Sequence, residues 1–239
     1  MNLHDQIFRR KSCRKYSQDP LPSEVLAEIE TFLTTLHPLL PDVGIQHRIV
    51  GPRDVRGLLA PKAPHFVVIS GKRHLHRDLC AGFLFQQLDL YLSARNLGCC
   101  WLGVIKGKQS PFDGDDILAI CFGTPIGPAA RTTADFNRKP LTEIATGTDP
   151  RLEAARLAPS GRNLQPWYFI VDADNIHAYC QTPGKLWGLL YTLQPLDLGI
   201  ALCHLYLATQ AAGGTFQFDL AFPDPPKAPQ GFVYVGTVC

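Results

Sequence analysis

Residues 158–169 read APSGRNLQPWYF, and they pass from the end of a helix through a loop into a strand. Proline and glycine set the turn, while Ser160, Asn163 and Gln165 supply hydrogen-bond donors and acceptors. Two amide side chains and a hydroxyl in one short loop could hold a planar polar ligand. They could equally cap the backbone of their own turn. The residues of this loop alone leave both interpretations open.

Hydrophobic patterning on both sides of the loop predicts strands and two long helices. Short runs rich in β-branched and aromatic residues indicate strands at 48–50, 66–69, 168–171 and 232–235. Two longer apolar segments, about 79–97 and 196–212, indicate helices that stop at glycine. Their apolar residues cover more than one stripe, so both helices are expected to be buried. Asp197 is expected to stabilise the N-terminus of the second helix.

The two halves of the chain follow a similar pattern. Each holds a basic segment, a helix, a strand and a buried helix, and each closes on an apolar run, at 122–124 (FGT) and 235–237 (VGT). The two runs lie about 110 residues apart, which favours an internal duplication. We expect one domain over 1–239 with pseudo-repeat halves of about 1–128 and 129–239. The second half lacks a clear partner for the strand at 66–69.

Composition and charge exclude several classes of protein. The 239 residues carry 23 Lys and Arg against 21 Asp and Glu, a net charge of +2 that is too balanced for a surface devoted to nucleic acid. Hydrophobic residues make up 46%, enough for a substantial core, and no apolar run reaches the ~18 residues of a membrane span. The first ten residues lack the apolar region of a secretory signal, and Asp5 interrupts the Arg-rich start of a mitochondrial transit peptide. We therefore expect a cytoplasmic protein.

Cysteine and histidine spacing indicates no metal site. None of the eight cysteines forms a C-x-x-C pair, and in a cytoplasmic protein all are expected to be reduced. Cys99 and Cys100 are interpreted as small buried residues at a helix end, with a redox pair as the alternative. The alternating residues of 74–78 (HLHRD) suit a metal only on a strand, whereas this stretch borders a helix. His204 is expected to be a hydrogen-bonded core residue.

Two further segments carry residues suited to ligand binding. Residues 9–16 (RRKSCRKY) place five cations among eight side chains, a composition that suits phosphate oxygens or, alternatively, a solvated basic turn. Residues 97–103 (LGCCWLG) end a buried helix, and Gly103 would let backbone amides approach a ligand. A buried tryptophan in a turn is the alternative there. Nucleic-acid binding is not favoured, because no known motif accompanies the basic segment.

Taken together, these segments resemble the FMN-dependent nitroreductase family. Residues 10–16 are similar to its Arg-Arg-Ser-x-Arg-x-Phe/Tyr opening, and residues 158–169 to its Ala-Pro-Ser-x-x-Asn-x-Gln-Pro-Trp-x-Phe loop. Residues 197–201 and 97–103 resemble the start and the end of its long central helix, and 138–140 (RKP) its later basic segment. The resemblance implies an α+β nitroreductase-like fold, with a central, mostly antiparallel sheet flanked by helices and the two buried helices packed together.

The resemblance also implies a cofactor and the residues that bind it. The FMN phosphate would lie on Arg10, Lys11, Ser12, Arg14 and Arg138. The ring and ribityl chain would lie on Pro159, Ser160, Gly161, Asn163 and Gln165, with the backbone amide of Leu102 or Gly103 facing flavin N5. NAD(P)H would be the electron donor, and a nitroaromatic, quinone or similar conjugated acceptor would follow it in ping-pong fashion. No side chain need act as acid or base.

The order of the motifs departs from that of ordinary members. In those, the Pro-Ser loop closely follows the basic opening and two identical chains share each site. Here the loop lies in the second half, so one chain could imitate the dimer. In the first half, residues 40–46 (LPDVGIQ) lack the serine and asparagine, and Asp42 would repel phosphate. We expect one intact FMN site, in a monomer or a weak homodimer, with a small-molecule acceptor as partner and neither nucleic acid nor membrane.

Two other functions stay open on the sequence. A non-catalytic scaffold or sensor would bind flavin or another anion without turnover. A flavoenzyme of the same fold could carry different chemistry, such as dehalogenation or flavin breakdown. The sequence does not identify the residues that select an acceptor.

Overall fold

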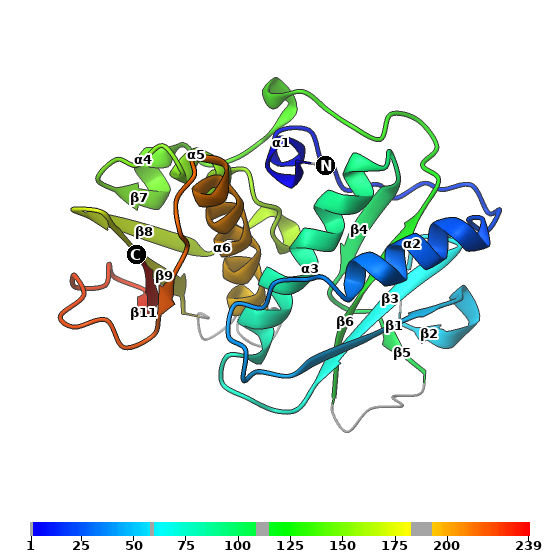
Figure 1. The fold of residues 1–239 in the computed structure, drawn as a ribbon, viewed down its shortest axis with the longest axis horizontal. Helices are drawn as coiled ribbons and strands as arrows, with labels where there is room; N and C mark the ends of the chain where they lie inside the picture. Colours follow the sequence, from blue (N-terminus) through cyan, green and yellow to red (C-terminus); the bar gives the residue numbers. More distant parts are fainter. Residues whose placement is uncertain (1, 58–59, 109–114, 183–192) are drawn as a thin grey trace.

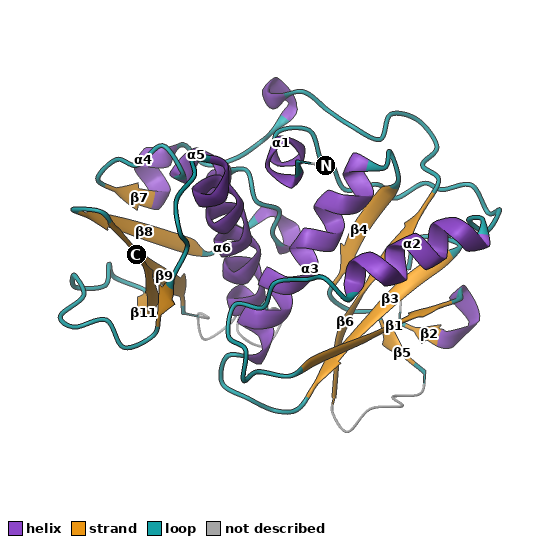
Figure 2. Ribbon diagram, viewed as in Figure 1, coloured by secondary structure: helices purple, strands orange, loops and turns teal. Residues whose placement is uncertain are grey.

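The computed structural model describes residues 2–57, 60–108, 115–182 and 193–239. Figure 1 shows two groups of strands, with the long helices α3 (Arg77–Ala94) and α6 (Gln194–Ala211) between them. Figure 2 shows the same mixture of helices, strands and long loops. The predicted α+β class, with mostly antiparallel strands and two packed helices, is confirmed. The strands form a separate sheet in each half of the chain, in place of one central sheet.

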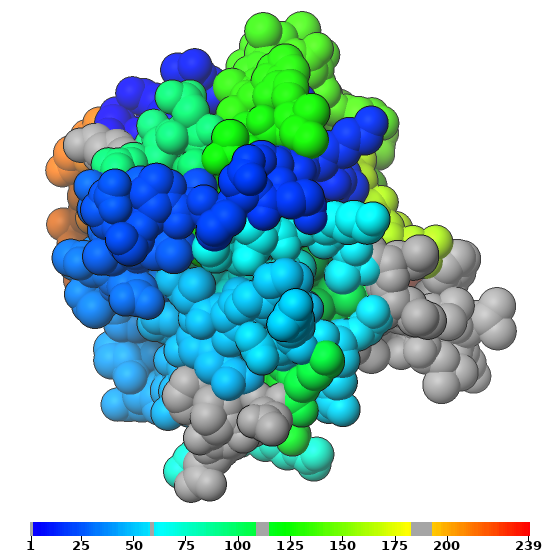
Figure 3. Space-filling view, turned by 90° about the vertical axis from the view of Figure 1, so that its right-hand side faces the viewer, coloured from blue at the N-terminus to red at the C-terminus, as the bar shows by residue number. Residues whose placement is uncertain are grey.

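The first-half sheet contains four antiparallel strands. Their order is β1-β3-β6-β4, with bounds Ile45–Val50, His65–Gly71, Asp115–Gly123 and Gly98–Leu102. Strand β3 is buried along its whole length, as its apolar run predicts. Helix α1 (Leu3–Ile7) contacts α3, and α2 (Ser23–Leu33) packs beside α3 by stacking Phe32 on Tyr91. A short ribbon, β2 (Val55–Arg56) with β5 (Lys106–Gly107), adjoins this sheet. First-half residues, coloured blue to green, form most of the face seen in Figure 3.

The second-half sheet contains five strands in the order β10-β11-β9-β8-β7. Their bounds are Phe218–Asp219, Phe232–Val238, Asn175–Gln181, Trp167–Asp172 and Ala145–Thr146. Only the edge pair β7 and β8 is parallel. Two short helices, α4 (Leu141–Ile144) and α5 (Leu152–Arg156), precede β8, and α5 packs on α6.

The two sheets share one strand order when each is read along the chain. The first half runs β1, β3, α3, β4, β6, and the second half runs β8, β9, α6, β10, β11. When the ribbon strands β2 and β5 and the edge strand β7 are set aside, the second strand of each series pairs with the first and the fourth, and the third lies at the edge beyond the fourth. Strand β9 thus holds the place in the second-half sheet that β3 holds in the first, where the sequence offers no clear partner for the strand at 66–69. Asn175 and His177 are polar, so the sequence of β9 lacks the continuous apolar run that identifies the other strands. We retain the duplication as a proposal, which this matching order supports.

Helices α3 and α6 cross at a pair of glycines. A Cβ atom on Gly82 would overlap the carbonyl group of Leu196, and a Cβ atom on Gly199 would overlap that of Leu79. Each glycine lies three residues after the leucine that meets the other helix, so the two contacts mirror each other. The missing side chains are what allow the two backbones to come this close.

The two central helices are buried on nearly every side, as predicted, but their ends differ from the prediction. Helix α3 ends at Ala94, and Asn96 takes a left-handed conformation with φ 57° where Gly98 had been expected to end the helix. Gly98 instead begins β4, so Cys99 and Cys100 lie in a strand and not at a helix end. Helix α6 begins two residues earlier than expected. Among the described residues, no helix is both long and apolar enough to cross a membrane.

Alanine at Gly82 or Gly199 is expected to destabilise the protein. The added methyl group must push away a backbone carbonyl of the other helix, and overpacking of this kind costs about 1–3 kcal/mol. Alanine gains at most ~1 kcal/mol over glycine from helix propensity, so the clash dominates. Urea unfolding followed by circular dichroism measures the loss. Gly44→Ala is the control, because a Cβ there meets nothing within 4 Å. Equal stabilities for all three variants would contradict the close crossing.

Candidate functional site

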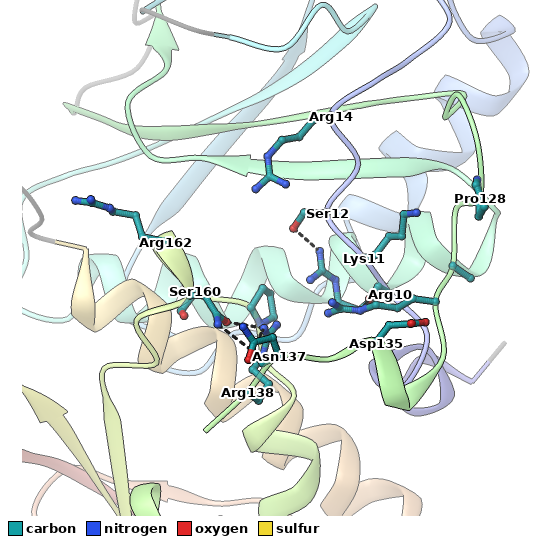
Figure 4. Close-up of a pocket in the computed structure, with 14 residues that line it drawn as sticks. Arg10, Lys11, Ser12, Arg14, Pro128, Asp135, Asn137, Arg138, Ser160 and Arg162 are labelled. Carbon is teal, nitrogen blue, oxygen red and sulfur yellow. Dashed lines mark hydrogen bonds between the residues drawn. The ribbon is translucent and has the colours of Figure 1, made fainter. Parts of the chain in front are cut away.

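A cavity of about 680 Å³ lies where the N-terminal segment, the connection before α4 and the loop before β8 meet. Figure 4 shows labelled side chains from these three segments gathered around it. We call it the basic cavity, because six of its lining residues are Lys or Arg and one is acidic. Its lining consists of Arg10, Lys11, Ser12, Arg14, Pro128, Ala130, Arg131, Asp135, Asn137, Arg138, Pro159, Ser160, Arg162 and Asn163.

The N-terminal part of this lining is held in extended form against the first-half sheet. Ser12 forms a parallel bridge with Cys99 of β4, and Arg10 forms an antiparallel bridge with Ala130. Side chains alternate along an extended chain, so Arg10, Ser12 and Arg14 fall on one side. The structure thus brings these three predicted residues, with Lys11, to the basic cavity.

Arg10 is already engaged by the protein. Its side chain is 1% exposed, and its Nη2 atom lies 3.2 Å from Oδ2 of Asp89 on α3. The same nitrogen donates to Oγ of Ser12 at 3.2 Å. Its Nε atom is buried without a hydrogen-bond partner. Arg10 is therefore not the fully available phosphate ligand that the sequence analysis expected, because Asp89 compensates its charge and Nε is the donor left over.

Two further arginines reach the cavity from the connection before α4. Arg138 donates from Nη1 to Oδ1 of Asn163 at 2.6 Å, and its Nε atom is buried without a partner. Arg131 donates from Nε to the carbonyl oxygen of Arg10 at 2.9 Å, and its guanidinium lies 3.4 Å from the ring centre of Phe136. Burial lowers the pKa of both arginines to about 10, and repulsion from neighbouring arginines adds to that effect. An anion in the cavity would relieve this repulsion.

Sequence reasoning identified Arg138 but missed Arg131, Asn137 and Arg162. Arg131 lies in a Thr-rich connection with no motif of its own. It reaches the cavity because its backbone N–H donates to the carbonyl of Arg9 at 2.9 Å, which aligns the connection with the N-terminal segment. A pairing between segments more than a hundred residues apart leaves no local signal in the sequence.

The loop at 159–165 is strained and held by its own polar side chains. Arg162, Asn163 and Gln165 have φ values of 54°, 61° and 50°, in the left-handed region that non-glycine residues rarely adopt. The backbone N–H of Gln165 donates to Oγ of Ser160 at 2.9 Å. The side chain of Gln165 accepts from the N–H of Lys139 at 2.8 Å and donates to the carbonyl of Asn163 at 3.1 Å.

These bonds separate the roles of the predicted loop residues. Pro159, Ser160 and Asn163 line the basic cavity, whereas Gln165 is 3% exposed and lines neither this cavity nor the next one. Gln165 therefore supports the loop from behind, which corrects the expectation that it contacts a ligand. Both interpretations of the loop hold in part, because the side chains that cap the turn also shape one wall of the cavity.

A second cavity of about 650 Å³ continues from the first. The two share Ser12, Arg14, Pro159, Ser160 and Arg162. We call it the mixed cavity, because apolar and charged groups alternate on its walls. Its other lining residues are Arg77, Asp78, Cys100, Trp101, Gly103, Val104, Lys106, Asp116, Ile117, Leu118, Gly161, Leu193, Leu196, Asp197 and Ile200.

The predicted residues Gly103 and Gly161 line this mixed cavity, and Leu102 does not. Leu102 packs instead against the smaller core cluster beside the first-half sheet. The backbone N–H of Gly161 donates a hydrogen bond that both carboxylate oxygens of Asp197 accept, each at 3.1 Å. Asp197 thus ties the loop to the first turn of α6, where its negative charge also lies at the N-terminus of the helix, as expected, while the N-cap residue is Leu193.

A chain of buried polar groups runs from the cavity into the core. Trp101 donates from Nε1 toward Asp89 and Gln86, at 3.3 Å in each case. The Nε2 amide of Gln86 lies 3.0 Å from Nε2 of His204, and Nδ1 of His204 lies 2.8 Å from the carbonyl of Ala154. Donation from Nδ1–H and acceptance at Nε2 satisfy a neutral imidazole. His204 is the hydrogen-bonded core residue that the sequence predicts.

The structure also places the cysteines and the histidines at positions 74 and 76. All eight cysteines are free, and Cys99 and Cys100 are buried, as their interpretation as small core residues requires. Burial raises the pKa of both thiols. His74 and His76 lie at the exposed approach to α3 with ring centres 5.7 Å apart. Within the described ranges, no group of three or more His, Cys, Asp or Glu could hold a metal ion.

One family model and one solved structure match most or all of this chain. The sequence model of the family described as "Putative TM nitroreductase" matches residues 2–209. Among curated proteins, the sequence finds no match. Among solved structures, the chain is similar to a putative nitroreductase from Thermotoga maritima MSB8, with 22% identity and a TM-score of 0.69 over 100% of this chain and 93% of that chain. That likeness shows the fold.

Two further structures are similar to part of the chain. One is a putative nitroreductase in complex with FMN from Desulfovibrio desulfuricans, with 17% identity and a TM-score of 0.44 over 63% of this chain and 99% of that chain. The other is an FMN-dependent nitroreductase from Clostridium difficile R20291, with 14% identity and a TM-score of 0.44 over 54% of this chain and 94% of that chain.

Asp89→Asn is expected to destabilise the protein by about 3–5 kcal/mol, because it leaves the buried charge of Arg10 without its counterion. Chemical denaturation at neutral pH measures this loss. Asp115→Asn is the matched control, since it breaks the ion pair with Arg73, in which both side chains are exposed. Exposed pairs contribute about 0–1 kcal/mol. Similar losses in the two variants would refute a special role for the buried pair.

His204→Gln is expected to reduce the pH dependence of stability. Burial lowers the pKa of His204 to about 3, so the unfolded chain binds a proton below its ordinary pKa of about 6.5 while the native protein does not. Stability should therefore fall as the pH drops from 6.5 toward 3, by about 1.4 kcal/mol per pH unit for this one proton. Urea unfolding at pH 6, 5 and 4 tests it. The unfolding free energy of the variant should change less steeply with pH, by the equivalent of about one bound proton. The exposed control His74→Gln should keep the pH dependence of the unmodified protein.

Proposed function

Since the chain belongs to the nitroreductase family whose model it matches, we propose that it is an oxidoreductase that works with bound FMN. One observation carries the proposal: the cation-rich basic cavity and the mixed cavity, part of whose wall is apolar, are joined through five shared residues. FMN has the same division, with a phosphate at one end and a flat conjugated ring at the other.

The basic cavity fits the phosphate end. Lys11, Arg14 and Arg131 surround it, and the unpartnered Nε atoms of Arg10 and Arg138 are buried donors that an oxyanion would satisfy. The lowered pKa values of Arg131 and Arg138 follow from burial and crowded positive charge, which a phosphate dianion would relieve. Asp135 is the single carboxylate in the lining.

The mixed cavity fits the ring end and leaves room for a second molecule. Trp101, Leu196 and Ile200 supply apolar wall, and the peptide at Gly103 can come close to a ligand because it carries no side chain. When bound, FMN supplies the redox chemistry, accepting a hydride from NAD(P)H and reducing a nitroaromatic, quinone or similar acceptor in a separate, ping-pong step. The chain's own residues bind and orient, and no side chain has to act as acid or base.

The proposal includes a single-chain arrangement. The walls of the basic cavity come from the N-terminal segment in the first half and from residues 128–163, which lie mostly in the second half, so both halves contribute to one site. In the first half, Leu39 and Val43 are buried in the core, and Leu40 packs against it. This packing supports one FMN site per chain in a monomer. Eight free cysteines support a reducing compartment such as the cytoplasm.

The visible absorption spectrum tests the activity. Purified protein is recorded alone, after addition of FMN, and then after addition of NADH or NADPH. A bound-flavin spectrum that bleaches with the nucleotide and returns in air is the expected result. Bound flavin that neither nucleotide bleaches would favour a sensor over an enzyme, and a protein that takes up no FMN would refute the cofactor assignment.

Arg131→Gln is expected to weaken FMN binding about tenfold or more, because it removes a charged donor from the phosphate. Riboflavin has the same ring without the phosphate, so its affinity should change by less than about twofold. Fluorescence quenching titrations measure both dissociation constants. Lys227→Gln, on an exposed loop in the second half, is the charge-matched control. Equal losses for FMN and riboflavin would show that the phosphate does not lie beside Arg131.

A further inference from the structure

The mixed cavity opens into a third, smaller cavity of about 300 Å³. Arg77, Lys106 and Asp116 line both, so the two spaces adjoin. We call the smaller one the distal cavity. Arg56 and Lys108 line it without lining either of the other cavities. The function proposed above uses neither of these two cations.

The β2–β5 ribbon places cations side by side on one wall of the distal cavity. Arg56 and Lys106 are directly opposed across the two antiparallel strands. Lys108 follows β5, and its backbone N–H donates to the carbonyl of Asp54 at 2.8 Å. Three positive side chains, all of them exposed, thereby lie on or next to one short ribbon, where their charges repel one another. Such an arrangement costs stability unless an anion or solvent separates them.

The carboxylates of the distal cavity are committed to other groups. Asp116 accepts from Oγ of Ser70 at 3.0 Å and from the N–H of Gly107 at 2.8 Å. Asp115 pairs with Arg73 at 2.9 Å. Across the described part of the chain, no ion pair joins Arg56, Lys106 or Lys108 to a carboxylate. The cavity therefore keeps a surplus of positive charge.

One lining residue of the distal cavity, Arg77, also carries a buried donor. Arg77 begins α3 and donates from Nε to Oδ1 of Asp78 at 3.0 Å. Its Nη1 atom is buried and has no hydrogen-bond partner. One guanidinium nitrogen thus stays available in the wall shared by the mixed and distal cavities. A multivalent oxyanion would satisfy this donor and the three ribbon cations together.

We propose that the distal cavity binds a phosphate monoester carried by the second substrate, the molecule that occupies the mixed cavity against the FMN ring. This inference rests on the proposed function. The phosphate could arrive on the electron donor, as the 2′-phosphate that distinguishes NADPH from NADH. It could also arrive on a phosphorylated conjugated acceptor. Both sources present the same dianion to Arg56, Lys106, Lys108 and Arg77.

The first arm of the test compares NADPH with NADH. The variants Arg56→Gln and Lys108→Gln are expected to lower the ratio of kcat/KM for NADPH over NADH about tenfold each, since each removes one charged contact to the phosphate. Lys227→Gln removes the same charge far along the chain, on the loop before β11, and should leave the ratio in place. A general loss of structure would lower both rate constants together and leave the ratio unchanged.

The second arm compares two acceptors that differ by a phosphate, 4-nitrobenzyl phosphate and 4-nitrobenzyl alcohol, with NADH as the donor. A fall in the first ratio assigns the phosphate to the donor, and a fall in this second ratio assigns it to the acceptor. If Arg56→Gln and Lys108→Gln move neither ratio, the proposal is wrong.

A direct binding measurement separates this inference from the cofactor assignment. Calorimetric titration with 2′,5′-ADP, which differs from 5′-AMP only by its 2′-phosphate, should give a dissociation constant about tenfold weaker for Arg56→Gln than for the unmodified protein. The corresponding titration with 5′-AMP should show no such difference. Protein that takes up no FMN but shows this difference refutes the FMN assignment and keeps the phosphate site. FMN-loaded protein whose Arg56→Gln variant shows neither this difference nor a change in the acceptor ratio overturns the phosphate site.

Discussion

The close crossing of α3 and α6 is the constraint on which the rest of the molecule depends. Gly82 and Gly199 let each helix rest on the backbone of the other, and this contact fixes the distance between the two halves. The three cavities draw their walls from segments that the two helices carry or border. Leu196 and Ile200, next to this crossing on α6, also line the mixed cavity. Packing at the centre and the shape of the site are therefore set by the same residues.

Charge is distributed along the joined cavities in an ordered way. The protein compensates Arg10 internally with Asp89, and leaves Arg131 and Arg138 crowded and partly desolvated at the basic end. Apolar groups such as Trp101 and Ile200 occur among the charged residues of the mixed cavity in the middle, and the ribbon cations occupy the far end. A ligand that is anionic at both ends and conjugated between them matches this order. Two molecules that meet at a flat ring match it equally well, which is the arrangement proposed for FMN and its second substrate.

Patterns within one segment were predictable, and contacts between distant segments were not. The buried helices and the strands at 66–69 and 168–171 follow from local apolar runs, so the sequence predicts them within a few residues. The sequence predicts a turn in place of the edge strand β4, because a glycine at position 98 is typical of a helix C-terminus. In the structure Asn96, in a left-handed conformation, follows the end of α3 instead. Arg131 and the Arg10–Asp89 pair depend on segments that meet only in the folded chain. Gln165 has the composition of a ligand contact, and only its bonds to Lys139 and Asn163 identify it as a support.

The buried Arg10–Asp89 pair also determines how the site can come apart. Arg10 is joined through its backbone to residue 130 and through its side chain to a helix at the centre of the core. The basic cavity is therefore not a cluster of loops that can fray while the core stays intact. Releasing the N-terminal segment leaves the Asp89 carboxylate buried on α3 without its partner, so the free energy of local opening approaches that of global unfolding. The amide hydrogens of Arg10 and Cys13, which donate to the carbonyls of Gln6 and Cys99, should consequently exchange with solvent about as slowly as those of the central helices, although they lie in a segment without regular structure.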